Sequence, residues 1–192
     1  MRRVGLLGGT FDPPHAAHLA LARAALDADA VDVVHVMPAG DPWQKSTGAA
    51  AEDRLAMTRL AFAGMDRCVV RDSEVTRPGP TYAIDTVRAL RDEGVTVRYI
   101  LGSDALASLP SWHSVDELVG LTDFLAVARP GVPVAAPAIP GLRVSVLRMA
   151  QRDEASRDIR AEILTSGRRP EGVAEPVWDY IVRHRLYGSG RA

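Results

Sequence analysis

A glycine pair followed by two closely spaced histidines has the clearest chemical potential in this sequence. Gly8 and Gly9 end an apolar run, and His15 and His18 follow at a spacing of three residues. Glycine lets a backbone approach a phosphate closely, and two histidines at this spacing project from one side of a helix's first turn. Thr10 adds a hydroxyl group between them. These residue types suit contacts with a triphosphate, whose charge imidazoles and backbone amides can neutralise.

Two simpler interpretations of this segment stay open. A histidine pair can bind zinc, although the sequence has no cysteine cluster, no HExxH pattern and no third ligand nearby. A glycine pair before a helix can also serve turn geometry alone. The combination favours nucleotidyl transfer, in which a phosphate oxygen of the acceptor is the nucleophile and the enzyme supplies alignment and charge neutralisation.

The elements that must position this segment alternate along the chain. The sequence predicts strands over 3–8, 31–37, 67–71, 95–101, 123–128 and 142–147. It predicts helices over 15–28, 52–63, 82–91, 154–164 and 176–184, and a proline-rich connection over 130–140. Such alternation implies parallel pairing and right-handed crossovers. We therefore expect an α/β fold, a Rossmann-like doubly wound parallel sheet with helices on both faces and further helices at the C-terminus.

Composition limits the size, the partners and the compartment. The 192 residues are 47% hydrophobic, which suffices for one core, so we expect a single domain over 1–192. The net charge of -1 comes from basic and acidic residues spread along the chain, which argues against a nucleic-acid polymer or a membrane surface as partner. The lone cysteine, Cys68, lies in an apolar run, and no stretch reaches the roughly 20 apolar residues of a membrane span. We expect a cytoplasmic protein without disulfides or a cleaved leader.

Five segments carry a resemblance to one enzyme family. They are GGTFDPPHAAH at 8–18, PWQK at 42–45, GPTYAIDT at 79–86, LGSDAL at 101–106 with Trp112 beyond it, and HRLY at 184–187. Together they resemble motifs of the bacterial nicotinate-nucleotide adenylyltransferases, which belong to the HxGH nucleotidyltransferase superfamily. The resemblance extends over nearly the whole chain.

This resemblance implies an activity. Such an enzyme transfers AMP from ATP to nicotinate mononucleotide, giving nicotinate adenine dinucleotide and pyrophosphate in NAD biosynthesis. The implied cofactor is Mg²⁺, held mainly by the triphosphate rather than by a protein metal site. The implied partners are a nucleoside triphosphate and a small phosphate-bearing acceptor, and assembly into a homo-oligomer is left open.

The resemblance also implies roles for individual residues. Transition-state contacts fall to Thr10, His15 and His18. Nucleotide contacts fall to Gly8, Gly9, Phe11, Gly102, Asp104, Ser156, Arg157 and Arg160. Acceptor contacts fall to Lys45, Thr81, Tyr82 and Trp112. Several of these residues have a plainer interpretation from sequence alone: Lys45 as a solvated loop lysine, Asp104 as a helix N-cap and Trp112 as a packing residue.

Four positions depart from the family pattern. Ala17, Ala83, Ala155 and Arg157 stand where glycine or hydroxyl residues are usual. They raise an alternative, a divergent cytidylyltransferase that transfers CMP from CTP to a small phosphate or phosphonate in phosphonate natural-product biosynthesis. Arg157 could grip phosphate or could lie on a solvated helix face beside Glu154 or Asp158. A third hypothesis is a nucleotide-binding regulator that keeps the fold without turnover.

Overall fold

The strands form one parallel sheet that winds outward in two directions from its centre. In a computed structural model that describes residues 1–128, 134–149, 152 and 154–189, six strands lie in the order β3-β2-β1-β4-β5-β6. They are β1 (Arg3–Gly9), β2 (Val33–Pro38), β3 (Cys68–Val70), β4 (Thr96–Gly102), β5 (Asp123–Ala128) and β6 (Val144–Arg148). All five neighbouring pairs are parallel. The predicted doubly wound α/β fold is confirmed.

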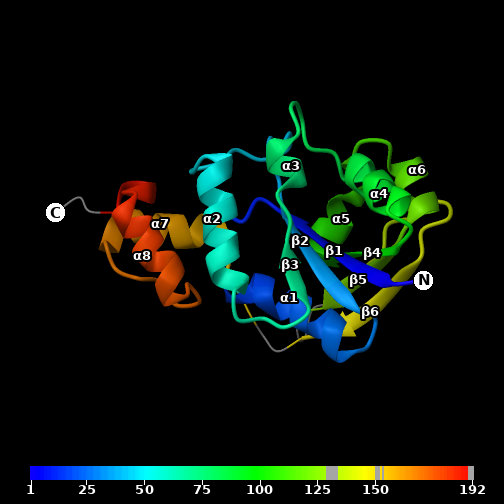
Figure 1. The fold of residues 1–192 in the computed structure, drawn as a ribbon, viewed down its shortest axis with the longest axis horizontal. Helices are drawn as coiled ribbons and strands as arrows, with labels where there is room; N and C mark the ends of the chain where they lie inside the picture. Colours follow the sequence, from blue (N-terminus) through cyan, green and yellow to red (C-terminus); the bar gives the residue numbers. More distant parts are fainter. Residues whose placement is uncertain (129–133, 150–151, 153, 190–192) are drawn as a thin grey trace.

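Helices cover both faces of this sheet (Figure 1). On one face lie α1 (Ala16–Asp27) and α2 (Ala51–Phe62). The other face is covered by α4 (Ala83–Asp92), α5 (Ser103–Ser108) and α6 (Val115–Leu121). The short helix α3 (Ser73–Thr76) follows β3, and the 3₁₀ turn η1 (Leu109–Ser111) extends α5.

The central strands are apolar on both sides because both faces are covered. Leu6 packs toward the α4 side, whereas the next residue, Leu7, packs toward the α1 side. Successive strand side chains alternate between the two faces, so a strand buried on both sides becomes a continuous apolar run. This is why β1 and β2 were recognisable from sequence.

The C-terminal helices form a separate layer against α2. They are α7 (Ser156–Ser166), α8 (Glu175–Arg183) and the 3₁₀ turn η2 (Leu186–Gly188). A third apolar cluster joins Met57 of α2 to Ile163 of α7 and Ile181 of α8. Figure 1 shows these helices beside α2, away from the outer strands. The packing brings the end of the chain next to the turn that follows β1.

Helix ends follow the expected signals in most places. Gly94 ends α4 with a φ of 79°, a left-handed conformation that glycine adopts without strain. The hypothesis that Asp104 is an N-cap is wrong, because Gly102 caps α5 and Asp104 lies inside its first turn.

Burial raises the pKa of the half-buried Cys68 thiol to about 11. The first part of the proline-rich connection, at 130–133, lies outside the described residues.

Among the residues that the structure describes, no helix is long and apolar enough to cross a bilayer.

Candidate active site

The glycine pair at 8–9 and the LGSDAL segment at 101–106 meet at the centre of the sheet. Gly9 ends β1 and Gly102 ends β4, and these two strands are neighbours. The winding direction reverses between them, from β2 and β3 on one side to β5 and β6 on the other. In open parallel sheets such a reversal opens a crevice at the carboxyl ends of the strands, where ligands bind. Residues 10–15, which we call the catalytic turn, lie at this crevice.

The two predicted histidines lie against one another at the start of α1. His15 is the N-cap residue, and its backbone N–H donates to Nδ1 of His18 at 3.2 Å. The two ring centroids are 3.9 Å apart, and the buried Phe11 ring lies 4.8 Å from the His18 ring. The structure thus brings together three residues that the sequence analysis placed in the site.

The electrostatic surroundings keep His18 neutral. Burial lowers its pKa well below 6.5, and the positive charges of His15 and Lys45 lower it further. Lys45 lies in the loop after β2, so a charge of this loop acts on His18. An anionic phosphate placed there would favour the protonated imidazole and raise this pKa. A bound triphosphate would therefore favour protonation of His18.

A fully buried arginine holds the catalytic turn in place through hydrogen bonds to the backbone. Arg54 of α2 is 1% exposed, and its guanidinium donates to the carbonyl oxygens of Thr10 at 2.8 Å, Gly40 at 2.9 Å and Ala49 at 3.3 Å. It connects the ends of β1 and β2 with the start of α2. The sequence analysis missed Arg54, because nothing in the local pattern distinguishes it from a solvated helix residue.

The predicted phosphate-binding residues of α7 divide into two groups. Ser156 donates to the carbonyl oxygen of Pro13 at 3.0 Å, and Arg160 donates to that of Asp12 at 2.7 Å. Both residues therefore lie beside the catalytic turn. The side chain of Arg157 is 86% exposed and pairs with Asp158 at 3.3 Å, as the solvated-face interpretation expects.

The glycines that end β1 and β4 lie in different surroundings. A Cβ atom on Gly8 would lie 2.5 Å from Oη of the buried Tyr99, and one on Gly9 would lie 3.2 Å from the Phe11 ring. Packing within the protein thus leaves no room for a side chain at Gly8 and little room for one at Gly9. A Cβ atom on Gly102 would meet nothing within 4 Å, so Gly102 faces open space at the crevice, with the exposed Asp104 nearby in the chain.

The predicted acceptor residues also come together. Residues 41–48, which we call the acceptor loop, are tied to Thr81 by two hydrogen bonds. The Thr81 N–H donates to the Asp41 carbonyl oxygen at 2.8 Å, and the Asp41 N–H donates to Thr81 Oγ1 at 3.1 Å. Within the loop, Gln44 Nε2 donates to the Ser111 carbonyl oxygen at 3.0 Å. Lys45 is exposed in the same loop.

Aromatic rings line this side of the crevice. Tyr82 is stacked on His113 at 4.1 Å and meets the Trp43 ring edge-on at 5.8 Å. Trp112 packs edge-on against Tyr99 at 5.3 Å, so both its packing and its acceptor interpretations are consistent with its place. His113 and Tyr99 were missed by the sequence analysis. The neighbouring Trp112 was the available signal for His113. Tyr99 lies within the predicted strand 95–101 and was treated as an ordinary strand residue.

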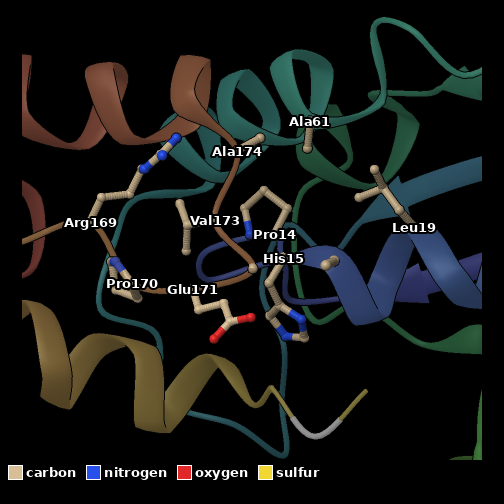
Figure 2. Close-up of a pocket in the computed structure, with 11 residues that line it drawn as sticks. Pro14, His15, Leu19, Ala61, Arg169, Pro170, Glu171, Val173 and Ala174 are labelled. Carbon is tan, nitrogen blue, oxygen red and sulfur yellow. The ribbon is translucent and has the colours of Figure 1, made fainter. Parts of the chain in front are cut away.

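A cleft opens beside His15 on the side of α2 and α8 (Figure 2). Its volume is about 530 Å³, and its lining includes His15, Leu19, Ala61, Arg169 and Glu171. Figure 2 shows Arg169 and Glu171 entering from the segment between α7 and α8, while Leu19 comes from α1. The acceptor-side residues do not line this cleft.

Metal ligands are sparse around the turn. Within residues 1–128, 134–149, 152 and 154–189, no group of three or more His, Cys, Asp or Glu side chains could hold a metal ion.

Comparison with known proteins decides the family. Residues 6–165 match the cytidylyltransferase-like family. A protein of Bordetella petrii named probable nicotinate-nucleotide adenylyltransferase is 42% identical over 97% of this chain and 100% of its own length. A protein of Leifsonia xyli with the same name is 39% identical over 97% of this chain and 94% of its own length. The chain belongs to the nicotinate-nucleotide adenylyltransferase family.

Membership of this family makes the chain a nucleotidyltransferase, and the names of these relatives favour adenylyl transfer over the cytidylyl alternative. A solved structure supports the fold independently. The Plasmodium falciparum nicotinic acid mononucleotide adenylyltransferase complexed with NaAD aligns over 100% of both chains with a TM-score of 0.79 at 17% identity. The adenylyltransferase fold is thus present from β1 through the C-terminal helices.

Proposed function

We propose that this enzyme transfers AMP from ATP to nicotinate mononucleotide, with release of pyrophosphate. The observation that supports this most is the close pairing of His15 and His18 at the start of α1, with the charge of Lys45 in the acceptor loop acting on His18. A site of this kind can receive a triphosphate on one side and a second phosphate on the other. The substrate identities come from the relatives' names.

The reaction needs one bond to form and one to break. A phosphate oxygen of the acceptor attacks the α-phosphorus of ATP, and the bond to the bridging oxygen of pyrophosphate breaks in line with it. His15 and His18 would stabilise the negative charge that grows on the transferred and leaving groups. Thr10 would donate its hydroxyl to a phosphate oxygen. No side chain has to act as a nucleophile.

Members of this family typically use a divalent metal. We propose Mg²⁺, which would neutralise charge on the triphosphate while this chain's residues orient the reactants. Two imidazoles whose ring centroids lie 3.9 Å apart at the helix start suit phosphate contacts better than Mg²⁺, which prefers oxygen ligands. The residues therefore fit an ion that arrives with its nucleotide.

Acceptor recognition would rest on charge and stacking. Lys45 would pair with the acceptor phosphate, because a mobile lysine can engage and release such a group in each cycle. The rings of Tyr82 and Trp112 would offer a surface for the pyridine ring, since aromatic rings gain from offset or edge contacts. Gly102 and Asp104 would face the ribose of the nucleotide, with the carboxylate accepting from its hydroxyls. Ser156 and Arg160 would act near the phosphates, and Arg157 at their outer edge.

A substrate screen tests this proposal. Pyrophosphate release would be measured with ATP, CTP, GTP and UTP, each with nicotinate mononucleotide and with a small phosphonate. We expect release with ATP and nicotinate mononucleotide above all other pairs, and loss of that release in His18→Ala. Preference for CTP with the phosphonate would support the cytidylyl alternative. If nucleotides raise the melting temperature of the protein but no pair releases pyrophosphate, the result would support the regulator hypothesis.

A further inference from the structure

The buried carboxylate of Asp12 joins three parts of the chain that are distant in sequence. It is 2% exposed, although a lone carboxylate is costly to bury. Its Oδ1 accepts from Tyr187 Oη at 2.7 Å, and its Oδ2 accepts from the Gly48 N–H at 2.5 Å. Arg160 Nη1 lies 3.5 Å from Oδ2 and also donates to the Asp12 carbonyl oxygen. The carboxylate is therefore fully engaged by the acceptor loop, η2 and α7.

We propose that Tyr187, through Asp12, is a positioning residue that sets the acceptor loop against the catalytic turn. This inference rests on the proposed function, because it assigns the end of the chain a part in acceptor binding. Tyr187 donates directly to the Asp12 carboxylate, which also accepts from the Gly48 amide, so we assign its effect on the loop to this carboxylate.

Gly48 packs closely against the side chains of Arg160 and Tyr187. A Cβ atom on Gly48 would lie 3.0 Å from Cδ of Arg160 and 3.1 Å from the Tyr187 ring. Glycine at this position lets the loop backbone lie directly on both side chains. Burial and the neighbouring Asp12 charge raise the pKa of Tyr187, so its hydroxyl keeps the proton that it donates. A hydrogen bond that a carboxylate accepts is stronger than a hydrogen bond between two neutral groups.

The backbone on both sides of the contact is strained. Phe11, next to Asp12, has a φ of 51°, and Arg185 and Tyr187 have φ values of 53° and 55°. Non-glycine residues rarely adopt these left-handed values, and such residues persist only when the surrounding structure holds them. The Tyr187–Asp12 bond is the contact in which the two strained segments meet. The strained backbone at Tyr187 therefore supports its assignment as a positioning residue.

The position of Gly48 explains why the acceptor should feel the contact. Gly48 follows Lys45 by three residues, and its bond to Asp12 closes the end of the acceptor loop that lies next to the catalytic turn. The other end is closed by Asp41 and Thr81. Loosening Asp12 would release the near end and spread Lys45 over more positions. The catalytic turn would keep its Arg54 contact through Thr10.

The kinetic test compares two tyrosines that each donate to a carboxylate. Tyr187→Phe removes the bond to Asp12, whereas Tyr180→Phe removes a bond of 2.9 Å to Asp53 on α2. We expect Tyr187→Phe to raise the KM for nicotinate mononucleotide by about three- to tenfold, the loss of one hydrogen bond. The KM for ATP should change less than twofold, and Tyr180→Phe should leave both KM values near wild type. Equal effects of the two variants, or equal effects on both substrates, would overturn the proposal.

A second measurement does not depend on activity. Hydrogen exchange of the Gly48 amide should be about threefold or more faster in Tyr187→Phe than in wild type or Tyr180→Phe, because its acceptor loses a restraint. Unchanged exchange at Gly48 would overturn the positioning role whatever the substrates prove to be. Inactive wild-type protein with faster Gly48 exchange in the variant would instead refute only the proposed function. If Tyr187→Phe fails to fold, Gly48→Ala, whose Cβ would press on the Tyr187 ring and on Arg160, replaces it in the kinetic test with the same expected difference between the two KM values.

Discussion

Replacing Glu74 by glutamine should remove a large part of the pH dependence of stability. Glu74, on α3, is 5% exposed, and its Oε1 accepts from Thr86 Oγ1 at 2.5 Å. Burial raises its pKa from 4.5 to about 7, although the Thr86 bond and the charge of Arg77 act in the opposite direction. A glutamine is neutral at every pH and can still accept the Thr86 bond. The variant therefore isolates the cost of ionising this carboxyl.

The magnitude follows from the two pKa values. Because the folded-state pKa is the higher one, the group's contribution to stability is fully present below pH 4.5 and is lost as the pH rises through about 7. A difference of about 2.5 in pKa corresponds to about 3 kcal/mol of unfolding free energy. Relative to wild type, Glu74→Gln should therefore gain about 3 kcal/mol between pH 4.5 and pH 8.

Urea denaturation at pH 5, 6, 7 and 8 measures this difference directly. Glu162→Gln is the matched control, since Glu162 is exposed on α7. The control should change by no more than about 0.5 kcal/mol at any of these pH values. Parallel stability curves for wild type and Glu74→Gln would refute the reasoning, because they would show that Glu74 ionises in the folded protein as freely as in the unfolded chain.

Three further predictions concern the site. His18→Ala should lower kcat by about a hundredfold or more in steady-state assays while circular dichroism and the melting temperature stay near wild type, because the imidazole acts on transition-state charge; a soluble variant with near wild-type kcat would remove it from the mechanism. Lys45→Ala should raise the KM for the acceptor more than the KM for ATP, and equal changes would place the lysine over the donor. Arg54→Met should lower the free energy of unfolding by about 3 kcal/mol or more, because three carbonyl groups lose the donor that the buried guanidinium supplies; the exposed pair of Arg59 with Asp72 on the same helix provides the control, and Arg59→Met should cost about 0.5 kcal/mol or less.

Much of the fold was predictable because its long elements carry strong patterns. Strands such as β1 and β2 are buried on both faces and form short apolar runs, which glycine and proline end. The short helices α3 and α6 were missed because four and seven residues give too few turns for a helical period to appear, and α5 was suggested only by Asp104 as a possible N-cap. Their positions depend on packing against the sheet.

The site was predictable where local spacing sets geometry and unpredictable where tertiary contacts do. His15 and His18 are one helical turn apart, so their proximity follows from sequence alone. The contact of Asp12 with Tyr187 spans 175 positions and requires the C-terminal helices to pack on α2. Gly8 illustrates the same limit, because Tyr99, rather than a ligand, occupies the space that a side chain would need.

The central claim is most directly tested by the product formed from ATP and nicotinate mononucleotide. Mass spectrometry should identify nicotinate adenine dinucleotide, and initial rates should give a kcat/KM on the order of 10⁴ M⁻¹s⁻¹ or better, as is common for metabolic enzymes. CTP in place of ATP should give a much lower value under the same conditions. Failure to form the dinucleotide, or faster pyrophosphate release with CTP than with ATP, would contradict the account.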